Sequence, residues 1–92
     1  MMFTKRSSME EIDKDAIRKL YDELNCYGLW SVFRHGSPGR PVRLEMVGLT
    51  KDRPRKRFEK IRAQMMQGSV YLVDPQGIIV DHGFEPMVRT RW

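Results

Sequence analysis

The sequence predicts a single α+β domain with the element order α-β-β-α-β-β, built as a four-stranded, mostly antiparallel sheet with two helices on one face. Two observations predict this fold class. Two segments repeat apolar residues at the three- and four-residue spacing of amphipathic helices, and four shorter segments have the composition of strands. A chain of 92 residues suffices for one domain, so we expect residues 1–92 to form a single unit.

The first helix is predicted from about residue 9 to residue 26, after an N-terminal arm. Ser8 and Glu11 have the spacing of a capping box, and Ser7 with Glu10 offers a competing register. The arm is expected to span residues 1–8. The apolar stripe of this helix consists of Met9, Ile12, Ala16, Leu20 and Leu24.

A long hairpin is predicted after this helix. Gly28 is expected to end the helix, because glycine adopts the left-handed conformation at little cost. Strands are expected over residues 29–34 and 42–49, with the glycine- and proline-rich segment 35–41 as the connecting loop. The second strand alternates, with Val42, Leu44 and Met46 expected on one face and Arg43 and Glu45 on the other.

The second helix and a second hairpin complete the predicted fold. Thr50 or Asp52 can cap the helix, Pro54 suits its first turn, and Gly68 is expected to end it. Its apolar stripe is Phe58, Ile61 and Met65. The last hairpin is expected from strands at 69–73 and 78–84 around the turn at 74–77, followed by a tail at 85–92.

The charge of the chain is unevenly distributed. The net charge is +5, yet residues 10–23 contain six acidic and three basic residues, whereas residues 51–62 contain seven basic and two acidic residues. The seven cations of the second helix region are Lys51, Arg53, Arg55, Lys56, Arg57, Lys60 and Arg62. If the apolar stripe faces the sheet, a row of them faces outward and can neutralise phosphates along a nucleic acid. An acidic protein partner and a merely solvated helix face are the alternatives.

Two further segments are candidate contact surfaces. Arg34, Arg40 and Arg43 lie in or beside the 35–41 loop, which is otherwise explained as a hairpin connection. In the tail, Arg89, Arg91 and Trp92 can stack on bases or fill a partner pocket, or Trp92 can pack back on the domain. Trp30 is expected to pack on the sheet.

The sequence contains no constellation that predicts catalysis. His35 and His82 are the two histidines, and Asp81 beside His82 would point to the opposite face of a regular strand. No Cys or His cluster has ligand spacing, so we expect neither a metal nor another cofactor. Cys26, at the end of the first helix, is expected to be inert. A metal-free ribonuclease toxin that uses His82 is the enzymatic alternative.

A cytoplasmic location is expected. The single cysteine suits a reducing compartment, and no apolar run is long enough to span a bilayer. Lys5 and Arg6 are not followed by the apolar stretch of a secretory signal.

In size, element order and the concentrated charge between Arg53 and Arg62, the chain resembles small proteins of phages and mobile elements, among them the anti-CRISPR inhibitors. The resemblance implies occlusion of a large ribonucleoprotein rather than chemistry, in the cytoplasm of the host cell. Many anti-CRISPR proteins are acidic mimics of nucleic acid, whereas this chain is basic. It would therefore contact RNA or an acidic protein surface instead.

Together these observations predict a small, non-enzymatic, basic binding protein that docks on nucleic acid or on a ribonucleoprotein complex and does not involve a membrane. Two alternatives stay open at this point. One is a self-associating protein-interaction module, such as a homodimer, and the other is the ribonuclease toxin.

Overall fold

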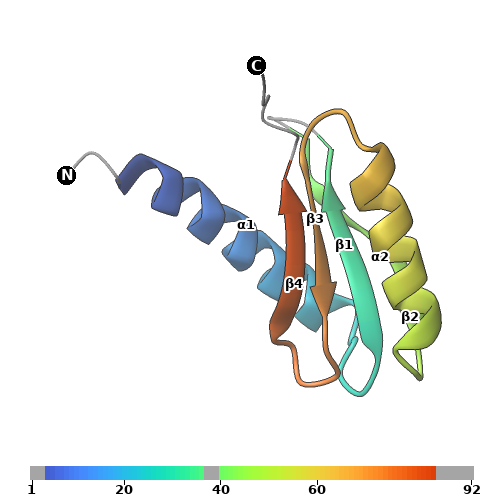
Figure 1. The fold of residues 1–92 in the computed structure, drawn as a ribbon. Coiled ribbons are helices and arrows are strands. Elements are labelled where there is room, and N and C mark those ends of the chain that lie inside the picture. Colours follow the sequence, from blue (N-terminus) through green and yellow to red (C-terminus); the bar gives the residue numbers. More distant parts are fainter. Residues whose placement is uncertain (1–3, 37–39, 85–92) are drawn as a thin grey trace.

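The computed structural model describes residues 4–36 and 40–84 and confirms the α+β class and the order α-β-β-α-β-β (Figure 1). The elements are α1 (Thr4–Glu23), β1 (Trp30–His35), β2 (Val42–Gly48), α2 (Asp52–Gln64), β3 (Ser69–Val73) and β4 (Ile79–Phe84). The strands form one sheet in the order β2-β1-β3-β4, and every neighbouring pair is antiparallel.

The two helices lie on opposite faces of the sheet, so the prediction of both helices on one face is wrong (Figure 1). All five residues of β3 are buried, which requires cover on both faces. Tyr71 and Val73 belong to the core cluster that contains Tyr21 of α1. Val70 and Leu72 belong to the cluster that contains Phe58 of α2. The domain is therefore a three-layer arrangement with a core on each side of the sheet.

The α1 helix begins earlier than predicted. It starts at Thr4, so Ser8 lies inside the helix rather than at its cap, and residues 4–8 of the expected arm are helical. Residues 1–3 lie outside the described part of the chain. Within residues 4–36 and 40–84, neither helix is both long and apolar enough to cross a membrane.

The end of α1 depends on Asn25 rather than on Gly28. Asn25 adopts a left-handed φ of 54°, and its backbone N–H donates to the Asp22 carbonyl. The Cys26 N–H reaches back to the Tyr21 carbonyl, which completes a Schellman motif. Asparagine tolerates this conformation better than most residues, so the helix ends before the glycine.

The α2 helix begins without a side-chain cap. Lys51 occupies the cap position and makes no capping side-chain hydrogen bond, so neither Thr50 nor Asp52 serves as the predicted cap. Pro54 is buried in the first turn, and its ring packs so closely on Gly48 that a Cβ there would come 3.0 Å from the proline Cγ. This contact fixes the start of α2 against the end of β2.

A β-bulge in β2 changes the predicted alternation. Val32 pairs with Met46 and Phe33 with Leu44, so Glu45 is the additional residue. Met46 therefore lies opposite Val32 on the α2 side, whereas Leu44 packs with the α1 core. The prediction that Leu44 and Met46 share a face is wrong, because a pattern of alternation cannot register an inserted residue.

Asp13 joins α1 to the two central strands. Its Oδ1 lies 3.1 Å from Nδ1 of His35 at the end of β1. Its Oδ2 accepts a hydrogen bond of 3.1 Å from the Ser69 hydroxyl and another from the Tyr71 hydroxyl, both on β3. The Asp13 side chain is only 13% exposed, so these donors replace most of the water that a free carboxylate would bind.

Replacement of Asp13 by alanine should destabilise the fold. The substitution removes the acceptor shared by three side chains near the core, which costs about 2–4 kcal/mol. Asp15→Ala on the exposed side of α1 is the matched control, with an expected cost below about 0.5 kcal/mol. Urea unfolding followed by circular dichroism measures both. Equal unfolding free energies for the two variants would contradict the anchoring role of Asp13.

Candidate nucleic-acid interface

The basic residues of α2 and the preceding turn lie on the outer surface, as the sequence predicts. Phe58 and Ile61 are buried against the sheet, which turns the remaining helix positions outward. Arg55 is half-buried. The exposed cations are Lys51, Arg53, Lys56, Arg57, Lys60 and Arg62.

Two of the arginines form ion pairs along the β4 side of the helix. Arg55 Nε lies 3.0 Å from Glu59 Oε2, and its Nη2 lies 3.9 Å from Asp81 Oδ2. Arg62 Nη1 lies 3.7 Å from the other oxygen of the same aspartate. The side chains of Arg55 and Glu59 are 42% and 50% exposed, so these pairs hold the guanidinium groups weakly.

Aromatic rings position two of the basic side chains. The Lys51 ammonium lies 5.2 Å from the centroid of the Trp30 ring, and Trp30 packs on the α2 core as predicted. Arg62 lies 5.2 Å from the Phe58 ring centroid. Its aliphatic stem covers Gly83, where a Cβ would overlap it. Lys51 and Arg62 are thus partly structural residues.

Three cations of α2 make no ion pair within the described residues. Arg53, Lys56 and Lys60, called here the unpaired row, are all exposed. Their spacing of three and four residues places them on one side of the helix. The row extends about 10 Å at a helical rise of about 1.5 Å per residue.

A hollow of about 260 Å³ lies beside this row, between α2 and the strands β1 and β2. We call it the α2 hollow. Arg34 reaches it from β1 and Glu45 from the bulge of β2. The α2 side chains at its wall are Arg57, Lys60, Ile61 and Gln64, with Met65 just beyond the helix. Lys60 therefore belongs to both the unpaired row and the hollow.

Glu45 is the single acidic residue among the described residues that line the α2 hollow. It is 10% exposed, and its Oε2 accepts a hydrogen bond of 3.1 Å from Arg43 Nε. Its Oε1 lies 3.7 Å from Arg57 Nη2. Arg34 pairs across the strands with Arg43, and the Arg34 Nε is buried with no hydrogen-bond partner among the described residues. One carboxylate thus faces four cations, since Lys60 also lines the hollow.

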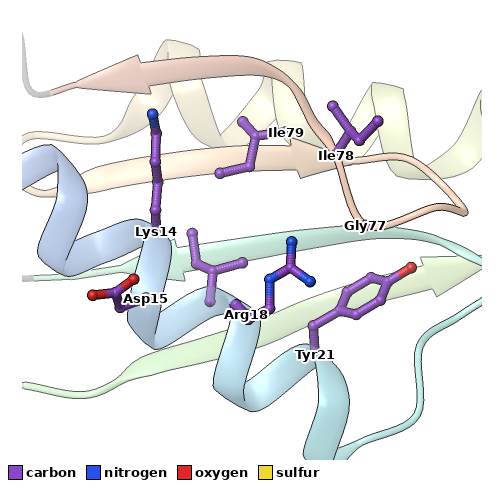
Figure 2. Close-up of a pocket in the computed structure, with 8 residues that line it drawn as sticks. Lys14, Asp15, Arg18, Tyr21, Gly77, Ile78 and Ile79 are labelled. Atoms are coloured by element: carbon purple, nitrogen blue, oxygen red, sulfur yellow. The ribbon is translucent and has the colours of Figure 1, made fainter.

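A second hollow, of about 430 Å³, lies on the α1 side near the β3–β4 turn (Figure 2). Lys14 and Arg18 extend from α1 toward Ile79 and Ile78, and Asp15 lies on the same helix. Its two cations are accompanied by a carboxylate and by apolar side chains. The excess of positive charge is therefore larger in the α2 hollow.

The two histidines differ in their surroundings. His82 pairs across the strands with Tyr71 and Asp81 with Leu72, so the two neighbours point to opposite faces, as predicted. His35 instead meets Asp13, 22 positions earlier in the chain. No local pattern indicates this contact, because it depends on how α1 crosses the sheet.

Several of the predicted contact residues are not brought to the α2 surface. Arg40 is exposed, precedes the first residue of β2, and lines neither hollow. Arg89, Arg91 and Trp92 lie outside the described residues, as does the loop segment 37–39. Neither Gln64 nor the role of Glu45 was predicted from the sequence, because only the bulge and the packing of α2 bring these side chains to the hollow.

Other chemistry-bearing side chains are dispersed. The Cys26 thiol is buried, and burial raises its pKa, which keeps it in the unreactive protonated form. Within the described ranges, no three His, Cys, Asp or Glu side chains converge as they would around a metal ion.

The ion pairs of Asp81 should contribute little to stability. In Asp81→Asn the partially exposed pairs with Arg55 and Arg62 are lost, and the expected decrease in unfolding free energy is below about 1 kcal/mol. Chemical denaturation at low and high salt measures it. A loss of several kcal/mol would show that these arginines serve the fold and are not available to a partner.

No family model, curated protein or solved structure matches the chain.

Proposed function

We propose that the protein is a non-enzymatic binder of nucleic acid, alone or within a ribonucleoprotein complex, and that the outer face of α2 is its contact surface. The unpaired row Arg53, Lys56 and Lys60 carries the proposal, because these exposed cations have no carboxylate partner in the described structure. Cations left uncompensated on a rigid helix can bind an anionic polymer without a prior loss of internal ion pairs.

The dimensions of the row suit a phosphate backbone. Its length of about 10 Å corresponds to about three phosphates along one strand of a duplex, at about 3.4 Å of helix axis each. Contacts of this kind position a protein on nucleic acid without reading the sequence. An acidic protein surface would also be attracted, but the regular spacing of the row suits a regular polyanion better.

The biological role that we attach to this binding is occlusion of a host ribonucleoprotein, in the manner of an anti-CRISPR inhibitor, in the host cytoplasm. The domain is small, and α2 covers one face of the sheet (Figure 1). The exposed cations of α2 lie on the side of the helix that faces away from the sheet. A compact domain of this kind can cover a nucleic-acid channel without any chemical step. A pull-down from host lysate, with and without nuclease, tests whether the captured complex depends on its nucleic acid.

Charge reversal of the unpaired row should abolish binding. The variant Arg53→Glu/Lys56→Glu/Lys60→Glu loses three phosphate contacts, and its affinity for labelled RNA or DNA should decrease by about 100-fold or more. Fluorescence anisotropy with single- and double-stranded RNA and DNA measures it. For the wild type, the logarithm of the affinity should decrease linearly with the logarithm of the salt concentration.

The matched control is Lys14→Glu/Arg18→Glu/Lys19→Glu, which changes the net charge equally at exposed positions of α1. It should bind several-fold more tightly than the α2 variant. Equal affinities for the two triple variants would contradict α2 as the contact surface. A species that self-associates in light scattering and ignores every nucleic acid would instead favour the protein-interaction module.

Metal-free RNA cleavage is a second candidate function, favoured by the contact between Asp13 and His35. A carboxylate 3.1 Å from Nδ1 orients an imidazole so that its Nε2 can act as a general base. The catalytic histidine would then be His35 rather than His82. RNA cleavage by the wild type that is lost in His35→Ala but kept in His82→Ala would support it, and intact RNA after prolonged incubation with the wild type would exclude it.

A further inference from the structure

We infer that the α2 hollow is a discrete subsite for one backbone phosphate and that Glu45 competes with this phosphate for the surrounding arginines. The inference rests on the proposed function and specifies which atoms hold the nucleic acid. The unpaired row supplies attraction along the backbone, whereas the hollow would hold one phosphodiester in a defined position beside Lys60.

Three basic side chains from two elements converge on the hollow. Arg34 comes from β1, Arg57 and Lys60 from α2, and each lines the same space. The Arg34 Nε is buried and has no acceptor among the described residues. Arg34 nevertheless lines the hollow, where charge-assisted hydrogen bonds from its guanidinium group would hold a phosphate oxygen.

The floor and rim of the hollow suit a phosphodiester group. Ile61 and Met65 are 8% and 4% exposed and form apolar walls, which strengthen the attraction between charges by excluding water. Gln64 adds an amide that can donate to a second phosphate oxygen. Arginines that converge from two elements match the geometry of a phosphate group better than a single lysine does.

The Glu45 carboxylate is the anion that would compete with the phosphate for the arginines. The bulge in β2 brings its carboxylate to Arg43 Nε at 3.1 Å and to Arg57 Nη2 at 3.7 Å. One carboxylate cannot neutralise both of these arginines together with Arg34 and Lys60. The residual positive charge draws in a phosphate, and the carboxylate limits how tightly that phosphate is held.

The test is a pair of charge-matched substitutions, with affinity for a fluorescein-labelled 20-nucleotide RNA as the readout. Glu45→Gln frees Arg57, which lines the hollow, for the phosphate and should raise the affinity about fivefold or more. Glu59→Gln changes the net charge equally on the outer side of α2, where Glu59 pairs with Arg55, and should raise it by about twofold or less.

Losses of charge provide the opposite test. Arg34→Gln should lower the affinity about tenfold, because it removes charge-assisted hydrogen bonds, whereas Arg40→Gln at an exposed position outside the hollow should lower it about twofold. If Arg34→Gln does not fold, Lys60→Gln replaces it, with Lys56→Gln as its control. Both lysines belong to the unpaired row, but only Lys60 of the two lines the hollow. Lys60→Gln should therefore lower the affinity for RNA more than Lys56→Gln does.

The outcomes separate the subsite from the proposed function. One outcome is that Glu45→Gln and Glu59→Gln have equal affinities for RNA, and that Arg34→Gln and Arg40→Gln also have equal affinities. If the α2 charge reversal still abolishes binding in that case, the subsite is wrong and the α2 surface remains the proposed contact surface. If the wild type binds no nucleic acid, both are wrong. Competition by polyglutamate as effective as that by RNA of equal charge would also overturn a phosphate subsite, because it would show that any carboxylate is accepted.

Discussion

Burial of the two central strands on both faces is the constraint on which the rest of the structure depends. Val32 and Phe33 of β1 are fully buried on opposite sides of the sheet, and β3 is buried throughout. A helix must therefore cover each face. Once α2 lies on one face with Phe58 and Ile61 against the strands, its cations have to point outward or along the strands that flank it.

This arrangement divides the cations of α2 into two groups with different properties. Arg55 and Arg62, toward β4, meet Asp81, and Arg62 also covers Gly83. Toward β2 the bulge supplies only Glu45, so that side keeps an excess of positive charge. The same packing that stabilises the helix thus concentrates uncompensated charge at one edge of it, and this edge is where we propose that a phosphate backbone binds.

The strands and the existence of both helices could be predicted because their signals are local. The apolar run Val70–Val73 does not alternate, which is typical of a strand covered on both faces, but the prediction of both helices on one face rested on the order of hairpins and helices instead. The position of Glu45 could not be predicted, because a bulge depends on the pairing of two strands. The contact of Asp13 with His35 likewise depends on tertiary packing.

A titration of the isotope-labelled protein with RNA, followed by NMR chemical shifts of backbone and arginine side-chain groups, tests most directly whether α2 is the contact surface. If α2 is the contact surface, the largest shifts occur on the outer face of α2 and at Arg34, whereas the exposed face of α1 around Lys14 and Lys19 stays nearly unchanged. Shifts concentrated on α1, or spread evenly over both faces of the domain, would contradict it.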